Sequence, residues 1–248
     1  MKISIIGYGE MAKAVARGLK KGHVDLEVVG RDEEKLKKFA KEFNCDYTTF
    51  DNFDSDYKIL FLAIKPYALR EVAKNFEKEA NIVISILAGT PLKELKKYIK
   101  AKYYLRAMPN IAAKYQASMS VVTGDKEIKD IGLKIFGKIG EVVWVDSDDE
   151  VDMATAIIGS GPAFLALIAE AISDGGVYIG LKRELSEKLT RGLFRSFASL
   201  KEDFATIKNE VMSPKGTTAE GIRSLEEDGV RGELMKGIIK TYEKSKKI

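Results

Sequence analysis

The sequence predicts an α/β protein, with a mostly parallel sheet in its first half and helices alone in its second half. Up to about residue 145, short apolar runs alternate with amphipathic stretches, as in a parallel sheet whose strands are joined by helices. After the acidic, polar segment 146–150 the strand pattern stops. We therefore expect a sheet domain over residues 1–146 and a helical domain over residues 150–248.

The elements follow from the spacing of apolar residues. Short apolar runs predict strands over residues 3–6, 26–29, 59–64, 82–87, 103–107, 118–123 and 142–145. Helical spacing predicts helices over residues 33–43, 126–138, 151–158, 163–172, 183–200, 204–211, 219–227 and 230–244.

The composition is that of an ordinary globular protein, with 45% hydrophobic and 31% charged residues and a net charge of +4. The lysines are spread along helices, so we expect no nucleic-acid partner. Cys45 is the only cysteine, which excludes an intramolecular disulfide and is typical of a reducing cytoplasm. Four apolar residues before Gly7 do not make a signal peptide, so we expect a cytoplasmic location.

The segment GYGEMA follows the first predicted strand and precedes an amphipathic stretch. Gly7 permits a tight turn, Gly9 lets the backbone approach a pyrophosphate, and Ala12 allows close packing of helix on strand. A glycine-rich turn in any α/β protein is the simpler alternative. Because the motif opens a βαβ pattern, we favour a dinucleotide coenzyme.

The second predicted strand ends at Gly30, where an NAD-binding protein usually has a carboxylate for the ribose. Arg31 follows, with Lys35 one turn later, and a guanidinium suits a 2′-phosphate. We therefore expect NADPH to be preferred over NADH. Asp32 weakens this expectation, although it is better interpreted as the N-cap of the next helix.

The segment from Ala154 to Gly176 has the strongest pattern of the second half. Ser160 is placed to cap a helix, with Pro162 at its first position. The helix is apolar on nearly every side, with Glu170 as the exception, so it must be buried in a core or against a second subunit. Its shortness and its charge argue against a membrane span. We expect this stretch to form the floor of an active site.

A turn between two predicted helices, Met212 to Gly221, offers backbone N–H groups and the hydroxyls of Thr217 and Thr218. Such a turn can hold a carboxylate. From spacing alone, a capped turn without a ligand explains it equally well.

Taken together, the segments GYGEMA, LAIKP, SILAG, RAMPN, GSGPAF and SPKGTT resemble the pyrroline-5-carboxylate reductase family, nearly end to end. The resemblance implies an N-terminal Rossmann-like, mostly parallel sheet that binds NAD(P) and a C-terminal all-α dimerisation domain. It also implies NADPH-dependent reduction of a cyclic imine to L-proline, the last step of proline biosynthesis, by a homodimer that can assemble into a decamer. We expect the protein to position the two reactants and exclude water, without a metal.

The resemblance also implies which residues form the site. Coenzyme binding is expected at Ile6, Gly7, Tyr8, Gly9, Glu10, Met11, Arg31, Ala63, Ile64, Lys65, Pro66, Ile86, Leu87, Ala88, Met108, Pro109 and Asn110. Substrate binding is expected at Asp148, Ser160, Gly161, Pro162, Ser213, Lys215, Gly216, Thr217 and Thr218. Thr155 is the candidate catalytic residue, through a hydrogen bond to the ring nitrogen or the nicotinamide amide. A hydrogen bond from Thr155 to its own helix is an equal alternative.

The chain departs from the family pattern at Lys215, where Gly is usual, at Phe164, where Tyr is usual, and at Ile111-Ala112, where Thr-Pro is usual. Lys215 would be strained if the family glycine is left-handed. Two other functions stay open. The chain can be a reductase of another small imine or of a 2-hydroxy acid, or a non-catalytic dinucleotide-binding module.

Overall fold

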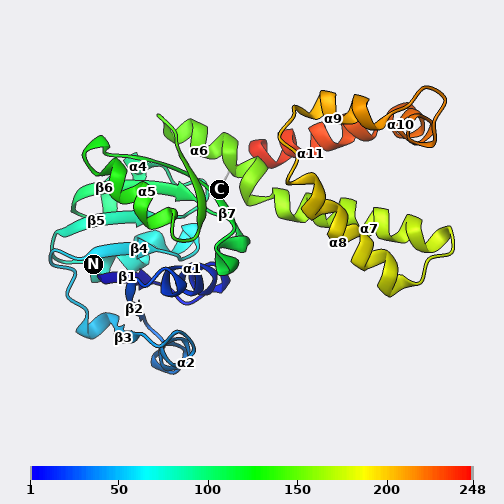
Figure 1. Cartoon of the computed structure of the whole chain (residues 1–248). Coiled ribbons are helices and arrows are strands. Elements are labelled where there is room, and N and C mark those ends of the chain that lie inside the picture. The colour runs from blue at the N-terminus through cyan, green and yellow to red at the C-terminus, as the bar shows by residue number, and fades with distance from the viewer. Residues whose placement is uncertain (1, 247–248) are drawn as a thin grey trace. The chain divides into compact units, whose positions relative to one another are not determined.

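A computed structural model describes residues 2–246 of the chain. The described residues form two compact units, residues 2–160 with 241–246 and residues 161–240 (Figure 1).

The first unit is built on an eight-stranded sheet in the order β3-β2-β1-β4-β5-β6-β7-β8. All neighbouring strands are parallel except β6 and β7, which confirms the predicted mostly parallel sheet. The strands are β1 (Lys2–Ile6), β2 (Asp25–Gly30), β3 (Asp46–Thr49), β4 (Ile59–Leu62), β5 (Ala80–Ser85), β6 (Ala101–Met108), β7 (Ser118–Gly124) and β8 (Gly140–Trp144).

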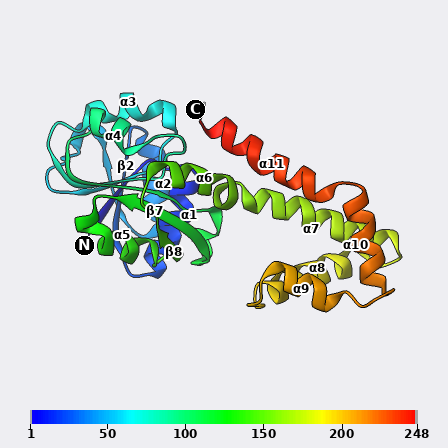
Figure 2. The ribbon, with the colours of Figure 1, turned by 90° about the horizontal axis from the view of Figure 1, so that it is seen from above.

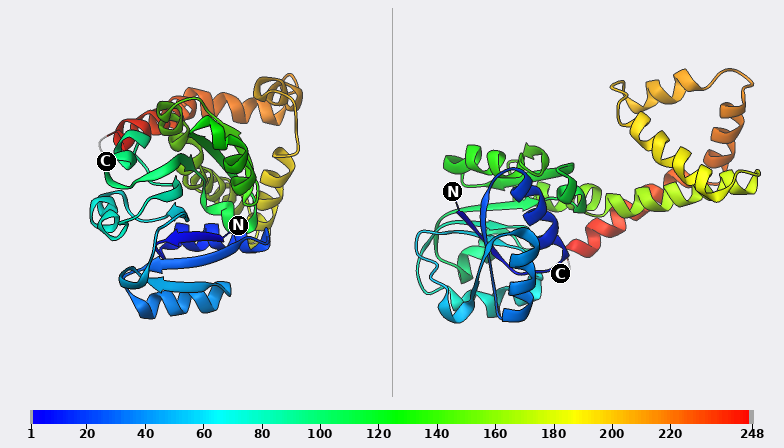
Figure 3. Two further views of the ribbon diagram at one scale, coloured as in Figure 1. Left: turned by 90° about the vertical axis from the view of Figure 1, so that its left-hand side faces the viewer. Right: turned by 60° about the horizontal axis from the view of Figure 1, so that its bottom comes forward.

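Helices cover both faces of this sheet (Figure 2). One face packs against α1 (Glu10–Lys21), α2 (Glu33–Phe43) and α5 (Lys129–Phe136), with fully buried Ile3, Ile5 and Phe136 between the layers. The other face packs against α3 (Leu69–Val72) and α4 (Leu92–Tyr98) through Leu62 and Leu95. The left view of Figure 3 shows α2 beside the edge strand β3 and its neighbour β2. Two apolar layers of this kind explain why the strands are apolar on both sides.

A single helical stretch runs from Asp148 to Tyr178. It consists of α6 (Asp148–Ala154), a wider π-helical turn (Thr155–Gly159) and α7 (Gly161–Tyr178). The predicted N-cap at Ser160 is therefore wrong, because that residue has a helical backbone (φ −95°, ψ −23°) and donates its N–H to the Thr155 carbonyl. Pro162 lies inside the helix. A wide turn is one way for a helix to accommodate the missing N–H of a proline.

The second unit contains α7, α8 (Arg183–Phe197), α9 (Phe204–Val211), α10 (Thr217–Glu227) and most of α11 (Val230–Ser245). Many of its apolar side chains are exposed, among them Leu167 (63% exposed), Leu189 and Leu193. Glu170 is exposed as well. The sequence predicts that the apolar helix is buried either in a core or against a second subunit. The exposed side chains show that the core of a single chain does not bury it.

By length and composition alone, the helix Asp148–Tyr178 can cross a membrane, since its mean hydropathy reaches 1.7 over an 18-residue window. Its length of 31 residues removes the shortness on which the sequence argument relied. An uncovered apolar face is also expected where a helix packs against a second subunit.

The division between the units falls after Ser160, beyond the segment 146–150 where the sequence pattern changes. The reason is that α6 packs on the sheet, through a small cluster formed by Met108, Val121 and Val151. The first turns of the helical half are thus part of the sheet unit.

Candidate active site

The segments predicted to bind coenzyme lie at one edge of the sheet. Ile6 is level with Leu62 on the neighbouring strand, Leu62 with Ser85, and Ser85 with Arg106. The strands β1, β4 and β5 therefore end together, and β6 continues two residues further in the same direction. The strand order reverses between β1 and β4, and ligands of such sheets bind at that switch point, beyond the carboxyl ends of the strands. The structure therefore brings residues 6–11, 63–66, 86–88 and 108–110 to the expected edge.

The turn after β1 has the geometry that a pyrophosphate needs. Gly7 has φ +110°, and a Cβ at this position would lie 2.8 Å from the Ala63 carbonyl oxygen, so only glycine fits. Gly9 is the N-cap of α1, and the space where its side chain would be is open. The first N–H groups of α1 have no partner in the helix. The residues present fit a bound dinucleotide.

The end of β2 carries the basic side chains predicted for a 2′-phosphate. Arg31 is exposed and, among the described residues, forms no ion pair. Lys35 pairs with the Asp32 carboxylate at 3.2 Å and lies 5.7 Å from the centre of the Tyr8 ring. Asp32 is the N-cap of α2, as expected, and accepts from the Lys35 backbone N–H at 3.1 Å. That hydrogen bond, with the ammonium group, lowers the pKa of Asp32.

Several of the other coenzyme residues can offer only their backbone. The side chains of Ile6, Leu87 and Met108 are at most 7% exposed and fill the core of the sheet. Glu10 points into solvent and pairs with Lys13 at 2.9 Å. Asn110 caps the turn that follows β6, because its side chain accepts from the Ala112 N–H at 3.0 Å.

Thr155 begins the π-helical turn and is 8% exposed. Its hydroxyl donates to the Val151 carbonyl at 2.7 Å, which is the alternative that the sequence left open. The hydroxyl proton is thereby used within the helix, while the oxygen keeps lone pairs for a donor. In this arrangement the Thr155 hydroxyl is available to a ligand as an acceptor.

Asp148 interacts with the protein on both carboxylate oxygens. It accepts from the Leu92 N–H, at 3.0 and 3.2 Å, and from the Arg106 guanidinium at 2.9 Å. These contacts give Asp148 a role in holding α4 and α6 together, and its predicted contact with substrate stays a prediction.

Arg106 is a residue that the sequence reasoning did not select. It lies on β6 with its side chain fully buried, and it pairs with both Asp148 and Asp152 on α6. A charged residue inside an apolar strand, followed in the chain by an acidic segment, was the available signal.

The second unit holds the predicted carboxylate-binding turn. Lys215 has φ +60°, which confirms that this position is left-handed. Gly216 is the N-cap of α10, and a side chain on it would collide with the Ser213 hydroxyl and approach the Ser213 carbonyl at 3.0 Å. The N–H groups of Thr217 and Thr218 open the helix. That this turn meets the coenzyme edge in one cleft stays a prediction.

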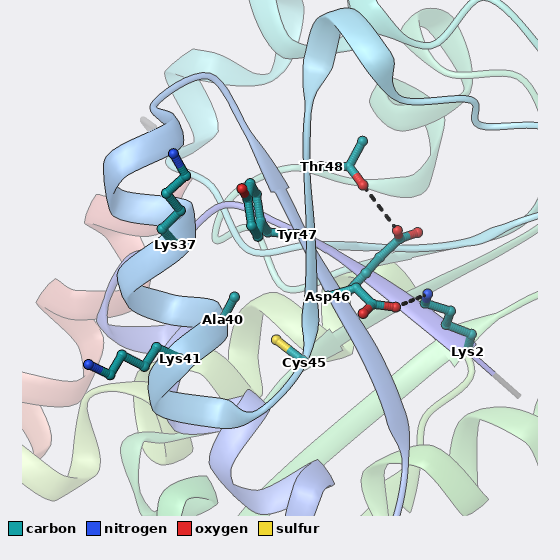
Figure 4. A pocket seen from close by; sticks show the side chains of 9 residues that line it. Lys2, Lys37, Ala40, Lys41, Cys45, Asp46, Tyr47 and Thr48 are labelled. Atoms are coloured by element: carbon teal, nitrogen blue, oxygen red, sulfur yellow. Dashed lines mark hydrogen bonds and ion pairs between the residues drawn. The ribbon is translucent and has the colours of Figure 1, made fainter.

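An open pocket of about 670 Å³ lies elsewhere. Figure 4 shows it between α2 and the amino end of β3, where Lys2 pairs with Asp46 at 2.6 Å. Parallel sheets bind their ligands at the opposite edge. We therefore assign this pocket no part in the site.

The switch point, the Gly7 turn and the open N-terminus of α1 place the chain among NAD(P)-binding oxidoreductases. The family model described as "NADP oxidoreductase coenzyme F420-dependent" matches residues 2–89, and the one described as "Pyrroline-5-carboxylate reductase dimerisation" matches residues 148–248. The pyrroline-5-carboxylate reductase of Helicobacter pylori is 35% identical over 254 residues, covering 98% of each chain. That of Synechocystis is 33% identical, covering 100% of this chain and 98% of the relative. The chain belongs to the pyrroline-5-carboxylate reductase family.

Solved structures agree with this assignment. The 1-pyrroline-5-carboxylate reductase of Streptococcus pyogenes superposes with a TM-score of 0.89 at 28% identity, covering 100% of this chain and 99% of that one. The pyrroline carboxylate reductase of Plasmodium falciparum, whose structure has NADP bound, gives 0.84 at 26% identity, with 99% and 98% covered. The predicted α/β architecture with a helical dimerisation domain is confirmed.

Proposed function

We propose that the chain reduces 1-pyrroline-5-carboxylate to L-proline with NADPH, the last step of proline biosynthesis. The family membership carries this proposal, because it extends over nearly the whole of both chains. Mixing the protein with NADPH and the imine should lower the absorbance of the nicotinamide band. A folded, dimeric sample that turns over neither NADPH nor NADH would refute the proposal, and other cyclic imines in the same assay would define its substrate range.

The coenzyme would be held by the edge of the first unit. We assign the pyrophosphate to Gly7, Gly9 and the N-terminus of α1, and the nicotinamide to Met108–Asn110. Arg31 would bind the 2′-phosphate, since it is a free guanidinium beyond β2. When bound, the coenzyme supplies the hydride. These residues contribute position and the exclusion of water, because a protonated imine accepts a hydride readily.

We assign the substrate carboxylate to the turn Ser213–Thr218. The N-terminus of an 11-residue helix offers N–H groups and a partial positive charge, and two threonine hydroxyls add donors. The left-handed backbone of Lys215 supports the same assignment, because a strained position persists where the surrounding structure maintains it. Lys215 also brings a positive charge that the family glycine lacks.

We assign the imine nitrogen to Thr155, as the hydrogen-bond acceptor. The reactive form of the substrate is protonated and therefore carries an N–H donor. The Thr155 hydroxyl donates to Val151 and so presents its lone pairs, which is the polarity that this donor needs. Thr155→Ser keeps the oxygen and should retain most of the turnover, whereas Thr155→Val should lose it at unchanged KM for NADPH.

We further propose a homodimer formed by the helices of the second unit, able to assemble into decamers, and a cytoplasmic location. The exposed leucines of α7 and α8 and the matched dimerisation family support the dimer. The single cysteine supports the reducing compartment. Light scattering on the purified protein measures the oligomer number directly.

A further inference from the structure

Arg106 is the largest fully buried side chain of the described residues, and it is charged. Such a charge is retained in a core only when it is paired. Its two terminal nitrogens are paired with separate carboxylates, Asp148 and Asp152, and one also donates to the Asp148 carbonyl at 3.2 Å. The Nε atom has no hydrogen-bond partner. The guanidinium is therefore dedicated to α6.

The two carboxylates lie four residues apart, and so on one face of α6, about one helical turn from each other. A single attachment point would let the helix rotate about its axis or slide along the sheet. Two points a turn apart prevent both movements. Only arginine offers two separate nitrogens in a rigid plane, since lysine has one.

The same face of β6 carries Met108 two residues after Arg106, about 7 Å further along the strand. Met108 packs on Val151, and the next turns of the helix continue over it. A side-chain carbon on Gly159 would lie 3.6 Å from the Met108 sulfur and 3.4 Å from the Thr155 methyl group. The π-helical turn, Thr155 and the end of β6 thus form one packed group, and Arg106 fixes its base.

We propose that Arg106 is a positioning residue for the reduction. It contacts neither reactant. Through Asp148 and Asp152 it fixes the rotation of the π-helical turn and its position along the sheet, and hence the position of Thr155 beside the end of β6. This inference rests on the proposed function, because that function gives Thr155 and Met108 their ligands.

The test variant is Arg106→Lys, which keeps the charge and removes one of the two attachments. We expect kcat to fall by about 10- to 100-fold, since a displacement near 1 Å costs that much, while KM for NADPH changes less than about threefold. Amide hydrogen exchange over residues 155–160 should become at least about tenfold faster, with the rest of the sheet unchanged. In Thr155→Val, the same change should have little further effect on kcat.

The matched control is Lys58→Met. It breaks another ion pair with a buried member, Lys58 with Glu27 at 2.8 Å, far from α6. We expect it to lower the melting temperature as Arg106→Lys does, with kcat and exchange over 155–160 unchanged. Equal losses of kcat in both variants, or unchanged exchange over 155–160 in Arg106→Lys, would overturn the proposal.

If Arg106→Lys does not fold, Asp152→Asn tests the proposal by the same measurements of kcat and of amide exchange over residues 155–160. It preserves shape and removes one charge, and we expect the same pattern with a smaller loss. Unaltered exchange over 155–160 in this variant would also overturn the proposal. Failure of the proposed function is separately visible, because the wild-type protein would then not turn over the imine, while exchange still reports on the attachment.

Discussion

Replacing Arg31 by Ala tests the coenzyme preference on a single side chain. The guanidinium follows β2 at the coenzyme edge, and no described residue competes for it as an ion-pair partner. Lys35 is engaged with Asp32, so it cannot fully take over the role. The only difference between the two coenzymes is the 2′-phosphate, so a loss confined to NADPH reports this contact.

The magnitude follows from the exposure of Arg31. A hydrogen bond to a charged group contributes about 1.5–3 kcal/mol, and we take the lower end, about 1.5–2, because an exposed charge is screened by solvent. Since 1.4 kcal/mol is a factor of ten, KM for NADPH should rise roughly 10- to 30-fold. KM for NADH should stay within about twofold, because no phosphate contact is lost.

The assay measures initial rates at saturating imine with each coenzyme in turn. Raising the salt from about 0.05 to 0.5 M should reduce the difference between wild type and variant, since the contact is electrostatic. Arg17→Ala is the matched control, because Arg17 is similarly exposed but is paired with Glu42 at 2.5 Å. Equal losses for NADPH and NADH would refute the reasoning.

Three further residues give testable outcomes. Thr218→Ala should raise KM for the imine about tenfold, the loss of one hydrogen bond to a charged group, and an unchanged KM would place the carboxylate elsewhere. Leu167→Lys should remove about 2 kcal/mol of apolar burial on each subunit and so raise the dimer Kd about a thousandfold in sedimentation, and a persistent dimer would exclude this face. Burial raises the pKa of the Cys45 thiol to about 11, so at pH 8 it should react slowly with a disulfide reagent until the protein unfolds. Because the folded pKa is the higher one, ionisation of Cys45 should favour unfolding progressively from about pH 9 up to about pH 11, a slope absent from Cys45→Ala.

Local sequence patterns predicted the bounds of an element correctly where its own residues determine where it begins and ends. The sequence predicts α2 over residues 33–43 and α9 over residues 204–211, and the structure has the same bounds, because each begins at an aspartate cap. β3 was missed, since its four residues, DYTT, are polar and lie at the edge of the sheet. Its existence depends on pairing with β2, which no local pattern encodes.

The geometry of the candidate site was predictable where the backbone of one segment forms it, and less so where long-range pairing forms it. Gly7 and Gly9 form a turn that the glycine spacing in the sequence predicts. Ser160 was assigned as a helix start because glycines and a proline usually interrupt a helix, whereas here the π-helical turn continues it. Arg106 was missed because its partners follow about forty residues later and only the fold joins them.

The exposed leucines of α7 and α8 also affect the protein between its synthesis and its dimerisation. In a newly made chain the apolar side chains of α7 and α8 remain exposed to solvent until a second copy binds. At low abundance that wait lengthens, and the waiting surface is what chaperones and proteases recognise. Slow pairing of newly made copies would therefore expose more of the protein to degradation.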